Sequence, residues 1–253
     1  MVGAGRTFKS RLNQVLRTFG YEVRRVSARG NDPFADMQHF VGRRTRPMLF
    51  DVGGNVGQTV EAFRRHFPDA IIHSFEPSPA SAAALEMKCG ALADVSVWNI
   101  ALGRHPGRLP LFENTRSDMS SFLQLGSKGW GQIDKITEVE VTTLDTFAAE
   151  KKIAFIDILK CDTQGFELEV FAGAEGLLEA ARIGMVYVEI TFADVYSKAP
   201  KFEDIVAAMI SKGFQLVSLY DINYVDELAG WTDALFIHRD YLKLSAAAPA
   251  PPH

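Results

Sequence analysis

Two acidic residues stand directly after apolar runs that are typical of buried strands. Asp162 follows the run 155–159, and Glu189 follows the run 185–188. If these runs are parallel strands of one open sheet, both carboxylates lie at its carboxyl edge, where α/β proteins bind their ligands. There a carboxylate can accept the proton of a hydroxyl group. We take Asp162 as the general base, with Glu189 assisting it or orienting the acceptor.

The same carboxylates have two other interpretations. Strand-end carboxylates suit Mg²⁺, which prefers oxygen ligands, and Asp145 would then be a third ligand. We do not favour a metal, because a carboxylate pair is weak evidence without that third ligand. Asp162 could instead cap the helix that follows it. Lys160 shares the Asp162 side of the strand and is expected to pair with a carboxylate, whereas Glu167 has either a site role or complements the helix dipole.

A glycine-rich stretch follows the first apolar run. It reads Asp51-Val-Gly-Gly-Asn-Val-Gly57, and Glu76 closes the next apolar run 19 residues beyond Gly57. A glycine turn after the first strand, with an acid about 20 residues further on, is the arrangement that holds a nucleotide ribose. The spacing does not fit the G-x-G-x-x-G pattern of dinucleotide sites, which excludes a dehydrogenase. The bland alternative is a glycine turn that binds nothing.

The loop is similar to the S-adenosylmethionine loop of Rossmann-like methyltransferases. In both, an Asp stands two residues before the first Gly and another Gly follows four residues after it, although Asn55 replaces the usual middle Gly here. The resemblance implies S-adenosylmethionine as cofactor. The residues expected to bind it are Asp51, Gly53, Asn55 and Gly57 for the methionine and ribose portion, Glu76 for the two ribose hydroxyls, and Asn99 or Ala101 near the adenine.

The order of the elements predicts an α/β fold, because strand-like runs alternate with amphipathic helical stretches. Two late strands lie close together, which indicates a hairpin at one sheet edge. The expected strands are 48–50, 71–75, 95–98, 108–112, 138–142, 155–159, 185–188, 214–219 and 234–238, and one helix is expected over 168–181. The arrangement is similar to the Rossmann-like, seven-stranded class I methyltransferase sheet with helices on both faces.

We divide the chain into three parts. Residues 1–46 form a basic, helical N-terminal extension, residues 47–240 the S-adenosylmethionine-dependent methyltransferase domain, and residues 241–253 a disordered tail that is rich in Ala and Pro. Within the domain, the polar, Gly/Ser-rich middle of residues 104–141 interrupts the alternation. A long polar loop inside a compact domain is functional or disordered. We favour an inserted segment on the substrate side.

The first 30 residues are basic, with seven Arg or Lys residues against the single acid Glu22. Apolar residues in this stretch fall on one helical face; they are Phe8, Leu12, Val15, Leu16 and Phe19. Two interpretations stay open. The apolar face packs on the domain and leaves the arginines in solvent, or residues 6–29 form an interfacial helix on anionic lipid.

Composition limits the partners and the compartment. The net charge is −4, and no basic stripe occurs beyond residues 1–46, which argues against a nucleic-acid partner. Cys89 and Cys161 are the two cysteines and cannot be interpreted as a disulfide framework. We therefore expect a cytoplasmic protein, peripheral at the inner membrane face if its N-terminal helix binds lipid. No apolar run approaches the ~18 residues that a membrane-spanning helix needs.

The most specific resemblance is carried by residues 158–174, Ile-Leu-Lys-Cys-Asp-Thr-Gln-Gly-Phe-Glu-Leu-Glu-Val-Phe-Ala-Gly-Ala. This stretch resembles the signature of the FkbM family of S-adenosylmethionine-dependent methyltransferases. Further matching stretches occur in the same order along the chain, at 50–57, 75–77, 99–103, 143–145, 188–190 and 233–236. Gly54 stands where the family often has Ala, and Cys161 where Ile or Val is common; neither departure threatens the chemistry.

The resemblance implies O-methylation of a hydroxyl group, often on a sugar, a glycolipid, a polyketide or a surface polysaccharide. The acceptor is argued by analogy alone, because fold and cofactor do not fix it. Our leading hypothesis is a sugar of a glycolipid or surface glycan, and the alternative is a polyketide or other small metabolite. An S-adenosylmethionine-binding scaffold is disfavoured because both strand-end carboxylates are present. Trp130, Phe192 and Tyr196 could stack on a sugar face.

Overall fold

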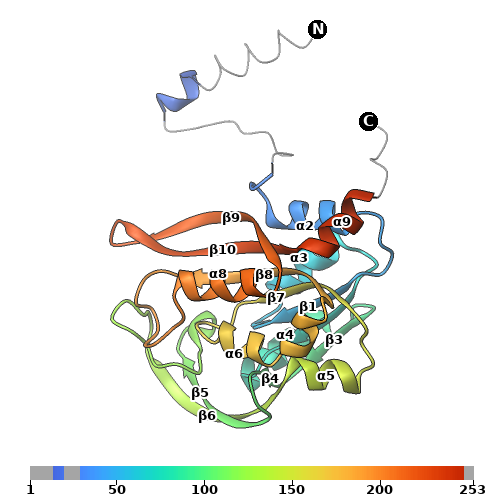
Figure 1. Ribbon diagram of the computed structural model, residues 1–253. Coiled ribbons are helices and arrows are strands. Elements are labelled where there is room, and N and C mark those ends of the chain that lie inside the picture. The colour runs from blue at the N-terminus through green and yellow to red at the C-terminus, as the bar shows by residue number, and fades with distance from the viewer. Residues whose placement is uncertain (1–13, 20–28, 248–253) are drawn as a thin grey trace.

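The computed structural model describes residues 14–19 and 29–247 (Figure 1). Strands and helices alternate along much of the longer range. In chain order the elements are α2 Pro33–Val41, β1 Met48–Val52, α3 Gln58–His66, β2 Ile71–Phe75, α4 Pro79–Cys89, β3 Val95–Trp98, β4 Ala101–Leu102, β5 Gly107–Asn114, η1 Ser117–Met119, β6 Ile133–Thr142, α5 Leu144–Glu150, β7 Ile156–Cys161, α6 Glu167–Ala172, α7 Glu175–Glu179, β8 Ile183–Thr191, α8 Phe202–Ser211, β9 Phe214–Val225, β10 Leu228–His238 and α9 Arg239–Ala247.

Seven strands form the main sheet, in the order β3-β2-β1-β7-β8-β10-β9. The first five strands run parallel to one another, whereas β10 runs antiparallel to both β8 and β9. Because β1 pairs with β2 on one side and with β7 on the other, the strand order reverses beside β1. A ligand crevice is expected outside the carboxyl ends of the strands at such a point. The predicted class I methyltransferase fold with its late hairpin is confirmed.

The core lies on both faces of the sheet, because successive side chains of a strand point to opposite sides. Residues Leu49, Ile158 and Met185 face α2, α3, α4 and α9, whereas the residues next to them in sequence, Phe50, Leu159 and Val186, face helices α5 to α8. Every residue of the central strand β7 is buried. Burying a large apolar side chain contributes about 1.5–3 kcal/mol, so the strand ends that carry the acids lie on a firmly packed support.

The two strands expected within 104–141 are present as β5 and β6, and together with β4 they form a second sheet. Its three strands have the order β4-β6-β5, and β5 pairs antiparallel with β6 along most of its length. Glu113 of β5 is buried and accepts a hydrogen bond from the hydroxyl of Ser78, 2.7 Å away, which joins this sheet to the start of α4. Residues 104–106 and 115–132 lie outside its strands, and the longer of these two segments contains the short helix η1.

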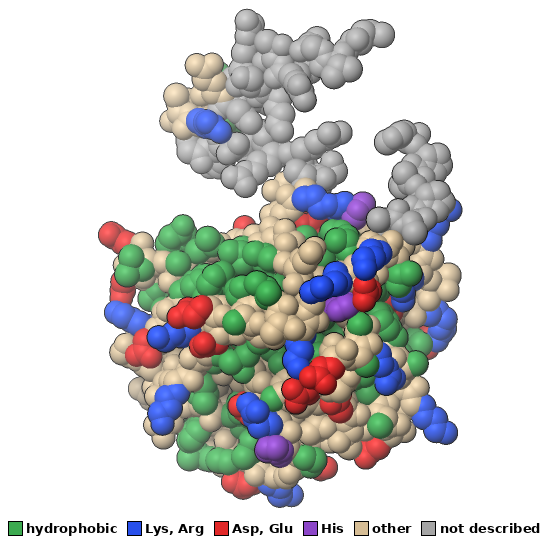
Figure 2. Space-filling model, viewed as in Figure 1, with side chains coloured by type: hydrophobic (Ala, Val, Ile, Leu, Met, Phe, Trp, Pro, Cys, Tyr) green, Lys and Arg blue, Asp and Glu red, His purple; other side chains and the backbone are tan. Residues whose placement is uncertain are grey.

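The β9–β10 hairpin closes one edge of the main sheet (Figure 1). Hydrophobic side chains gather over it on the face shown in Figure 2, and the exposed apolar residues of the hairpin are Leu216, Ile222, Tyr224 and Leu228. The register shifts on both sides of Trp231. Such irregularities re-aim a side chain next to an active site and twist a free edge away from further pairing.

The single helix predicted over 168–181 is wrong. The structure has two short helices, α6 and α7, which are separated at Gly173. A Cβ atom on Gly173 would lie 2.0 Å from the main-chain oxygen of Gly103, and the N–H of Asp145 donates to the Gly173 carbonyl at 2.9 Å. The close approach of two other segments therefore breaks the helix, although local propensity favours its continuation.

The disordered tail predicted from residue 241 is also wrong in its first part. Helix α9 continues to Ala247. The ring of Tyr241 stacks on Phe155, and its hydroxyl donates to Asp157 Oδ1 at 2.9 Å. Both contacts are with the amino-terminal side of β7, so the helix is held by residues far away in sequence. Residues 248–253 lie outside the described part of the chain.

The N-terminal extension is described only in part. Helix α2 is capped by Asp32, whose carboxylate accepts from the N–H groups of Phe34 and Ala35, as the sequence suggests. Residues 14–17 are helical, but Val15 and Phe19 are exposed, so the described part of the predicted apolar face does not pack on the domain. Residues 1–13 and 20–28 lie outside the described ranges. Within those ranges, no helix is long and apolar enough to cross a membrane.

Candidate active site

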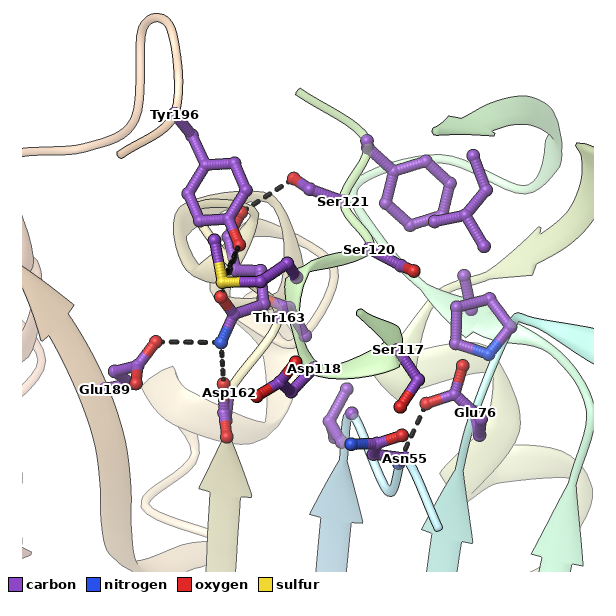
Figure 3. Close-up of a pocket in the computed structure, with 18 of the residues that line it drawn as sticks. Asn55, Glu76, Ser117, Asp118, Ser120, Ser121, Asp162, Thr163, Glu189 and Tyr196 are labelled. Atoms are coloured by element: carbon purple, nitrogen blue, oxygen red, sulfur yellow. Dashed lines mark hydrogen bonds between the residues drawn. The ribbon is translucent and has the colours of Figure 1, made fainter. Parts of the chain in front are cut away.

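A cavity of about 340 Å³ opens at the carboxyl ends of β1, β2, β7 and β8, within the size range of small-molecule sites. Glu76 and Ala101 line one end and Glu189 the other, and Asp162 lies on the Glu189 side with Gly53 next to it. Residues 116–122 of the inserted segment form a further part of its wall. The segment therefore lies over the strand ends, which is where the sequence interpretation put it (Figure 3).

The glycine loop owes its shape to contacts with two neighbouring strands. Gly53 has a φ of +83°, and its N–H donates to the carbonyl of Phe75 at 3.0 Å. A Cβ atom at this position would lie only 1.8 Å from the main-chain oxygen of Asp162. Only glycine allows this conformation and this approach, so Gly53 lets the end of β7 come next to the loop at the cavity wall.

Glu76 lies at the first end of the cavity with both carboxylate oxygens held by main-chain donors. Its Oε2 accepts from the N–H of Asn55 and its Oε1 from the N–H of Ser78, each at 2.8 Å. Burial raises the pKa of Glu76 to about 7, against the opposing effect of these two hydrogen bonds. Each oxygen keeps a second lone pair, so the carboxylate can accept two hydroxyl groups from a ligand.

Two predicted cofactor residues lie behind the cavity wall. Asp51 is fully buried; it accepts from the hydroxyl of Ser74 at 2.7 Å and lies 3.1 Å from Lys160 Nζ. Burial raises its pKa, against the effect of Lys160. Gly57 begins α3, and a Cβ there would lie 2.8 Å from the sulfur of Cys89. Both residues support the glycine loop from behind the cavity wall. Neither lines the cavity, so the prediction that they contact the cofactor directly is corrected.

At the adenine end, too, one predicted residue lies behind the cavity wall and the other is part of it. Asn99 donates through Nδ2 to the carbonyls of Glu76 and Pro77, at 2.8 and 3.0 Å, and is not part of the cavity wall. Ala101 is part of the wall and is flanked there by Ile100 and Leu102. This apolar stretch suits a flat heterocycle, so of the two predicted alternatives the structure favours Ala101.

The cofactor fits these residues. The amide oxygen Asn55 Oδ1 is buried without a hydrogen-bond partner among the described residues, in a loop that borders the cavity. The Glu76 carboxylate, which has free lone pairs, and the apolar stretch at Ala101 line the same cavity. A diol acceptor next to an apolar slot matches a nucleoside, and S-adenosylmethionine contains one.

At the other end, Asp162 and Glu189 face each other across one amide group (Figure 3). Gln164 donates through Nε2 to Asp162 Oδ1 at 2.7 Å and to Glu189 Oε2 at 2.9 Å. The amide oxygen accepts from the hydroxyl of Tyr196 at 2.5 Å. Sequence analysis missed Gln164 as a site residue. The available signal was its position inside the Asp-Thr-Gln-Gly turn, but its φ of +56° depends on the fold.

Lys160 is the cation beneath this end of the site. Its ammonium group lies 3.1 Å from Asp51 Oδ1 and 3.3 Å from Asp162 Oδ2, and it donates to the carbonyl of Gly53 at 3.0 Å. Burial lowers the pKa of Lys160, but the carboxylates of Asp162 and Asp51 outweigh that effect and hold it above its usual value. The expected pairing of Lys160 with a carboxylate is thus found twice.

The acids on the β8 side favour their protonated forms. Burial, followed by the charge of Asp162, raises the pKa of Glu189 well above its usual range. The same two causes raise the pKa of Asp233 to about 6, and Asp233 lies opposite Glu189 in the β8–β10 pairing. Of the two predicted catalytic acids, Asp162 is the one with a direct ion pair to Lys160, at 3.3 Å.

Asp145, the predicted third metal ligand, lies away from the other two. Its carboxylate accepts from the N–H groups of Gly176 and Leu177 at 2.8 and 2.9 Å and so caps α7. It takes no part in the wall of the main cavity. Among the residues that the structure describes, no group of three or more His, Cys, Asp or Glu side chains is arranged to hold a metal. The ligand set with Asp145 is therefore wrong.

Glu167 is buried and serves the loop rather than the solvent face of its helix. Its Oε1 accepts from the N–H groups of Thr163 and Gly165, at 2.9 and 3.1 Å, and from the hydroxyl of Thr163. Burial raises its pKa against the effect of those donors. The turn that carries Asp162 and Gln164 is thus closed from inside by a carboxylate.

Aromatic side chains border the acceptor end. Trp130 and Trp231 form an edge-to-face pair with ring centres 5.3 Å apart, and both are part of the cavity wall. Tyr196 is buried in the same wall, whereas Phe192 packs against Phe202 of α8 outside it. Of the three aromatic residues predicted to stack on an acceptor, Trp130 and Tyr196 are therefore at the cavity and Phe192 is not.

A class I methyltransferase sheet with a nucleoside-binding wall and a carboxylate pair at its strand ends defines a methyltransferase. A comparison with protein families agrees, since the model described as "Methyltransferase FkbM domain" matches residues 51–216, more than half of the chain. The chain belongs to the FkbM family of methyltransferases, and its methyl donor is S-adenosylmethionine.

Individual relatives are distant. The 2-O-methyltransferase NoeI of Sinorhizobium fredii (strain NBRC 101917 / NGR234) is 27% identical over 161 residues, which cover 59% of this chain and 65% of that protein, just under two thirds of its length. The 31-O-demethyl-FK506 methyltransferase FkbM of Streptomyces tacrolimicus is 27% identical over 216 residues, 73% of this chain and 79% of the relative. A solved structure of magnesium protoporphyrin IX methyltransferase (ChlM) from Synechocystis PCC 6803 aligns with a TM-score of 0.45 at 12% identity, covering 92% of this chain and 95% of that chain.

Proposed function

We propose that the protein transfers a methyl group to a hydroxyl oxygen, on a sugar of a glycolipid or surface glycan. The observation that carries the proposal is the carboxylate pair of Asp162 and Glu189 at the end of the cavity away from Glu76. A hydroxyl acceptor must lose its proton when its oxygen is methylated, and a carboxylate within reach of that oxygen can take it. The names of both relatives described above also refer to an oxygen position.

The residues divide the work between binding and proton transfer. S-adenosylmethionine, when bound, supplies an electrophilic methyl group. Gly53 lets backbone approach the ligand, and Glu76 accepts its ribose hydroxyls. Asp162 accepts the acceptor's proton at Oδ2, the oxygen that faces Lys160, because its Oδ1 is engaged by Gln164. The ammonium group of Lys160 lies 3.3 Å from that oxygen, and the surrounding wall excludes water.

The aromatic pair supports a sugar as the acceptor. Trp130 and Trp231 line the same cavity as Ser117, Ser120 and Asp118. A sugar ring has apolar faces and a polar rim of hydroxyls, so this combination of groups suits it. The alternative acceptor is a polyketide or similar metabolite, and the relative that acts on 31-O-demethyl-FK506 keeps it open. A scaffold without activity would have no use for a supported carboxylate pair.

The experiment supplies the full chain with S-adenosylmethionine carrying a deuterated methyl group and a panel of acceptors. The panel contains methyl glycosides of hexoses and deoxyhexoses on one side and macrocyclic alcohols on the other, and products are read by mass spectrometry. We expect labelled O-methyl glycosides. Labelled macrocycles alone would move the assignment to the alternative acceptor, and S-adenosylmethionine binding with no labelled product from any hydroxyl would contradict O-methylation.

The aromatic pair gives a second arm to this experiment. Trp231→Ala removes stacking surface worth about 1 kcal/mol, so KM for a glycoside should rise several-fold while kcat changes little. Tyr224→Ala, an exposed aromatic on the same hairpin, is the matched control and should leave KM unchanged. An unchanged KM in Trp231→Ala would remove the aromatic support for a sugar acceptor.

We further propose that the protein is cytoplasmic and meets its acceptor at the inner membrane face through residues 6–29. Their basic charge is the support for this proposal, since each Lys or Arg near an anionic surface contributes about 1 kcal/mol. Co-sedimentation with vesicles of anionic phospholipid tests it. The full chain should bind at low salt and a form lacking residues 1–28 should not; equal binding by both would exclude this segment.

A further inference from the structure

The side chain of Gln164 holds the two strand-end carboxylates but takes no part in the proposed proton transfer. We propose that Gln164 is a positioning residue that fixes the directions of the Asp162 and Glu189 carboxylates, and that Tyr196 in turn fixes the orientation of Gln164. This inference rests on the role proposed above for Asp162. It deepens that role by naming the two residues that aim both carboxylates at one hydroxyl group.

An amide nitrogen carries two hydrogens, and Gln164 uses one for each acid. The Nε2 atom lies 2.7 Å from Asp162 Oδ1 and 2.9 Å from Glu189 Oε2 (Figure 3). Both distances lie within the usual range of N–H···O hydrogen bonds. Neither carboxylate can rotate away without breaking such a bond, so the two directions are coupled through one nitrogen atom.

The oxygen of the Gln164 amide is held on the side away from the two acids. Its oxygen accepts a hydrogen bond of 2.5 Å from the hydroxyl of Tyr196, a residue that is only 2% exposed. If the amide of Gln164 turned over, its oxygen would face two carboxylates and its hydrogens would face the tyrosine hydroxyl. A tyrosine hydroxyl can donate or accept, so the two acids set the direction of the nitrogen, and the hydroxyl of the packed Tyr196 ring anchors the oxygen end of the amide.

Three segments that are distant in sequence meet at this amide. The backbone of Gln164 is in the left-handed region, and its carbonyl accepts from the hydroxyl of Ser121 at 2.7 Å. Next to Tyr196, the carbonyl of Val195 accepts from the N–H of Gly126 at 2.8 Å. The inserted segment thus holds both Gln164 and the loop that carries Tyr196. This shared support explains how the partly buried turn keeps one geometry.

The charges around the amide explain why a neutral donor is used. The groups that face the carboxylate pair from neighbouring elements are Lys160 on β7, Glu167 at the start of α6 and Asp233 on β10. One cation therefore already serves the site. A second cation at position 164 would weaken the ability of Asp162 to take up a proton, whereas an amide holds both acids and leaves that ability intact.

The test is a double-mutant cycle on the full chain with Gln164→Met, Tyr196→Phe and the double variant. Met has nearly the length of Gln but no donor, and Phe keeps the packed ring. With the glycoside that gives the highest turnover in the panel above, Gln164→Met should lower kcat about tenfold or more, as expected for the loss of hydrogen bonds to charged groups. KM and the calorimetric affinity for S-adenosylmethionine should stay within about twofold. The double variant should equal Gln164→Met.

Gln164→Asn serves as the conservative variant. It keeps the amide but is one carbon shorter, so it should restore part of the lost kcat if the donor is what matters. Tyr224→Phe removes an exposed hydroxyl on β9 and should leave kcat unchanged. If the losses of the two single variants multiply in the double variant, Tyr196 does not act through Gln164, and the proposal is overturned. Unchanged kcat in Gln164→Met would overturn it as well.

A second measurement needs no acceptor and separates this inference from the proposed function. Proton–nitrogen correlation spectra of ¹⁵N-labelled protein contain one pair of signals for each side-chain amide. The pair that is missing from the spectrum of Gln164→Met is assigned to Gln164. Tyr196→Phe should move this pair, and Tyr224→Phe should not. If no acceptor is methylated but the pair moves, the proposed function fails while the orientation by Tyr196 stands. A pair that stays in place in Tyr196→Phe overturns the inference whatever the acceptor.

Discussion

The main-chain N–H of Asn55 donates to the Glu76 carboxylate at 2.8 Å. This bond links the glycine loop after β1 to the first residue beyond β2, so the loop and the acid that would hold the ribose form one unit. Asn55 has a φ of +44°, a value that Asn tolerates better than most residues. The carboxylate therefore fixes the loop in the ligand-binding shape before any ligand arrives.

Glu76→Ala tests this unit through donor binding. The change removes the acceptor of two ribose hydroxyls and the partner of two main-chain N–H groups. Loss of hydrogen bonds to a charged group costs about 1.5–3 kcal/mol, so the affinity for S-adenosylmethionine measured by calorimetry should fall about ten- to hundredfold. Glu203→Ala, at an exposed position on α8, is the matched control. Equal affinities of wild type and Glu76→Ala would remove Glu76 from the cofactor site.

The raised pKa of Glu76 predicts how stability depends on pH. Its value of about 7 in the folded protein lies above the 4.5 of an ordinary Glu. Between these two values the folded state binds more protons than the unfolded state, so stability falls as pH rises. The contribution is fully present below pH ~4.5 and is lost as pH rises through ~7; its order of magnitude is about 3 kcal/mol.

Thermal unfolding from pH 5 to 8 measures this dependence without ligand. The difference in melting temperature between wild type and Glu76→Gln should shrink or reverse toward pH 8, because Gln does not titrate. Other buried acids with raised pKa values, such as Asp233, change both proteins alike and cancel in the difference. A difference that stays constant from pH 5 to 8 would show that Glu76 has an ordinary pKa.

Asp162→Asn tests the proton acceptor. The amide occupies nearly the same space but cannot take up a proton at neutral pH, and a general base contributes about 10²- to 10⁴-fold to a rate. We expect kcat to fall by that range while the calorimetric affinity for S-adenosylmethionine is retained, because Asp162 stands at the acceptor end. Asp134→Asn, on the exposed part of β6, is the control. Turnover near that of wild type would exclude Asp162 as the base.

The sequence placed Asp162, Glu189 and Glu76 correctly because strand ends are visible in apolar runs, and parallel strands bring their carboxyl ends to one edge. It assigned Asp51 and Gly57 to the cofactor for the same reason, since they adjoin the loop. Which loop residues face the cavity and which lie beneath it depends on Ser74, Lys160 and Cys89, and these contacts come from other elements.

The remaining errors also arose from tertiary contacts. Nothing near Gly173 in sequence indicates that the Gly103 backbone will break the helix there, and Tyr241 shows its role only when Phe155 and Asp157 lie beside it. Gln164 is the clearest case. Its two carboxylate partners and its tyrosine come from three different elements, so its bridging role is invisible in any local pattern.

Gly53→Ala tests the contact between the loop and β7. Alanine at a φ of +83° is strained, and its Cβ would lie 1.8 Å from the main-chain oxygen of Asp162. A strained backbone position costs about 1–3 kcal/mol before the clash is counted, so unfolding by urea should show a loss of at least that size. Gly107→Ala is the control for the clash alone, because Gly107 also has a positive φ, of +159°, but a Cβ there meets nothing within 4 Å. If Gly53→Ala is as stable as Gly107→Ala and binds S-adenosylmethionine normally, the end of β7 does not set the shape of the glycine loop. If it folds but loses both cofactor affinity and turnover, the same backbone contact couples the donor end of the site to the carboxylate end.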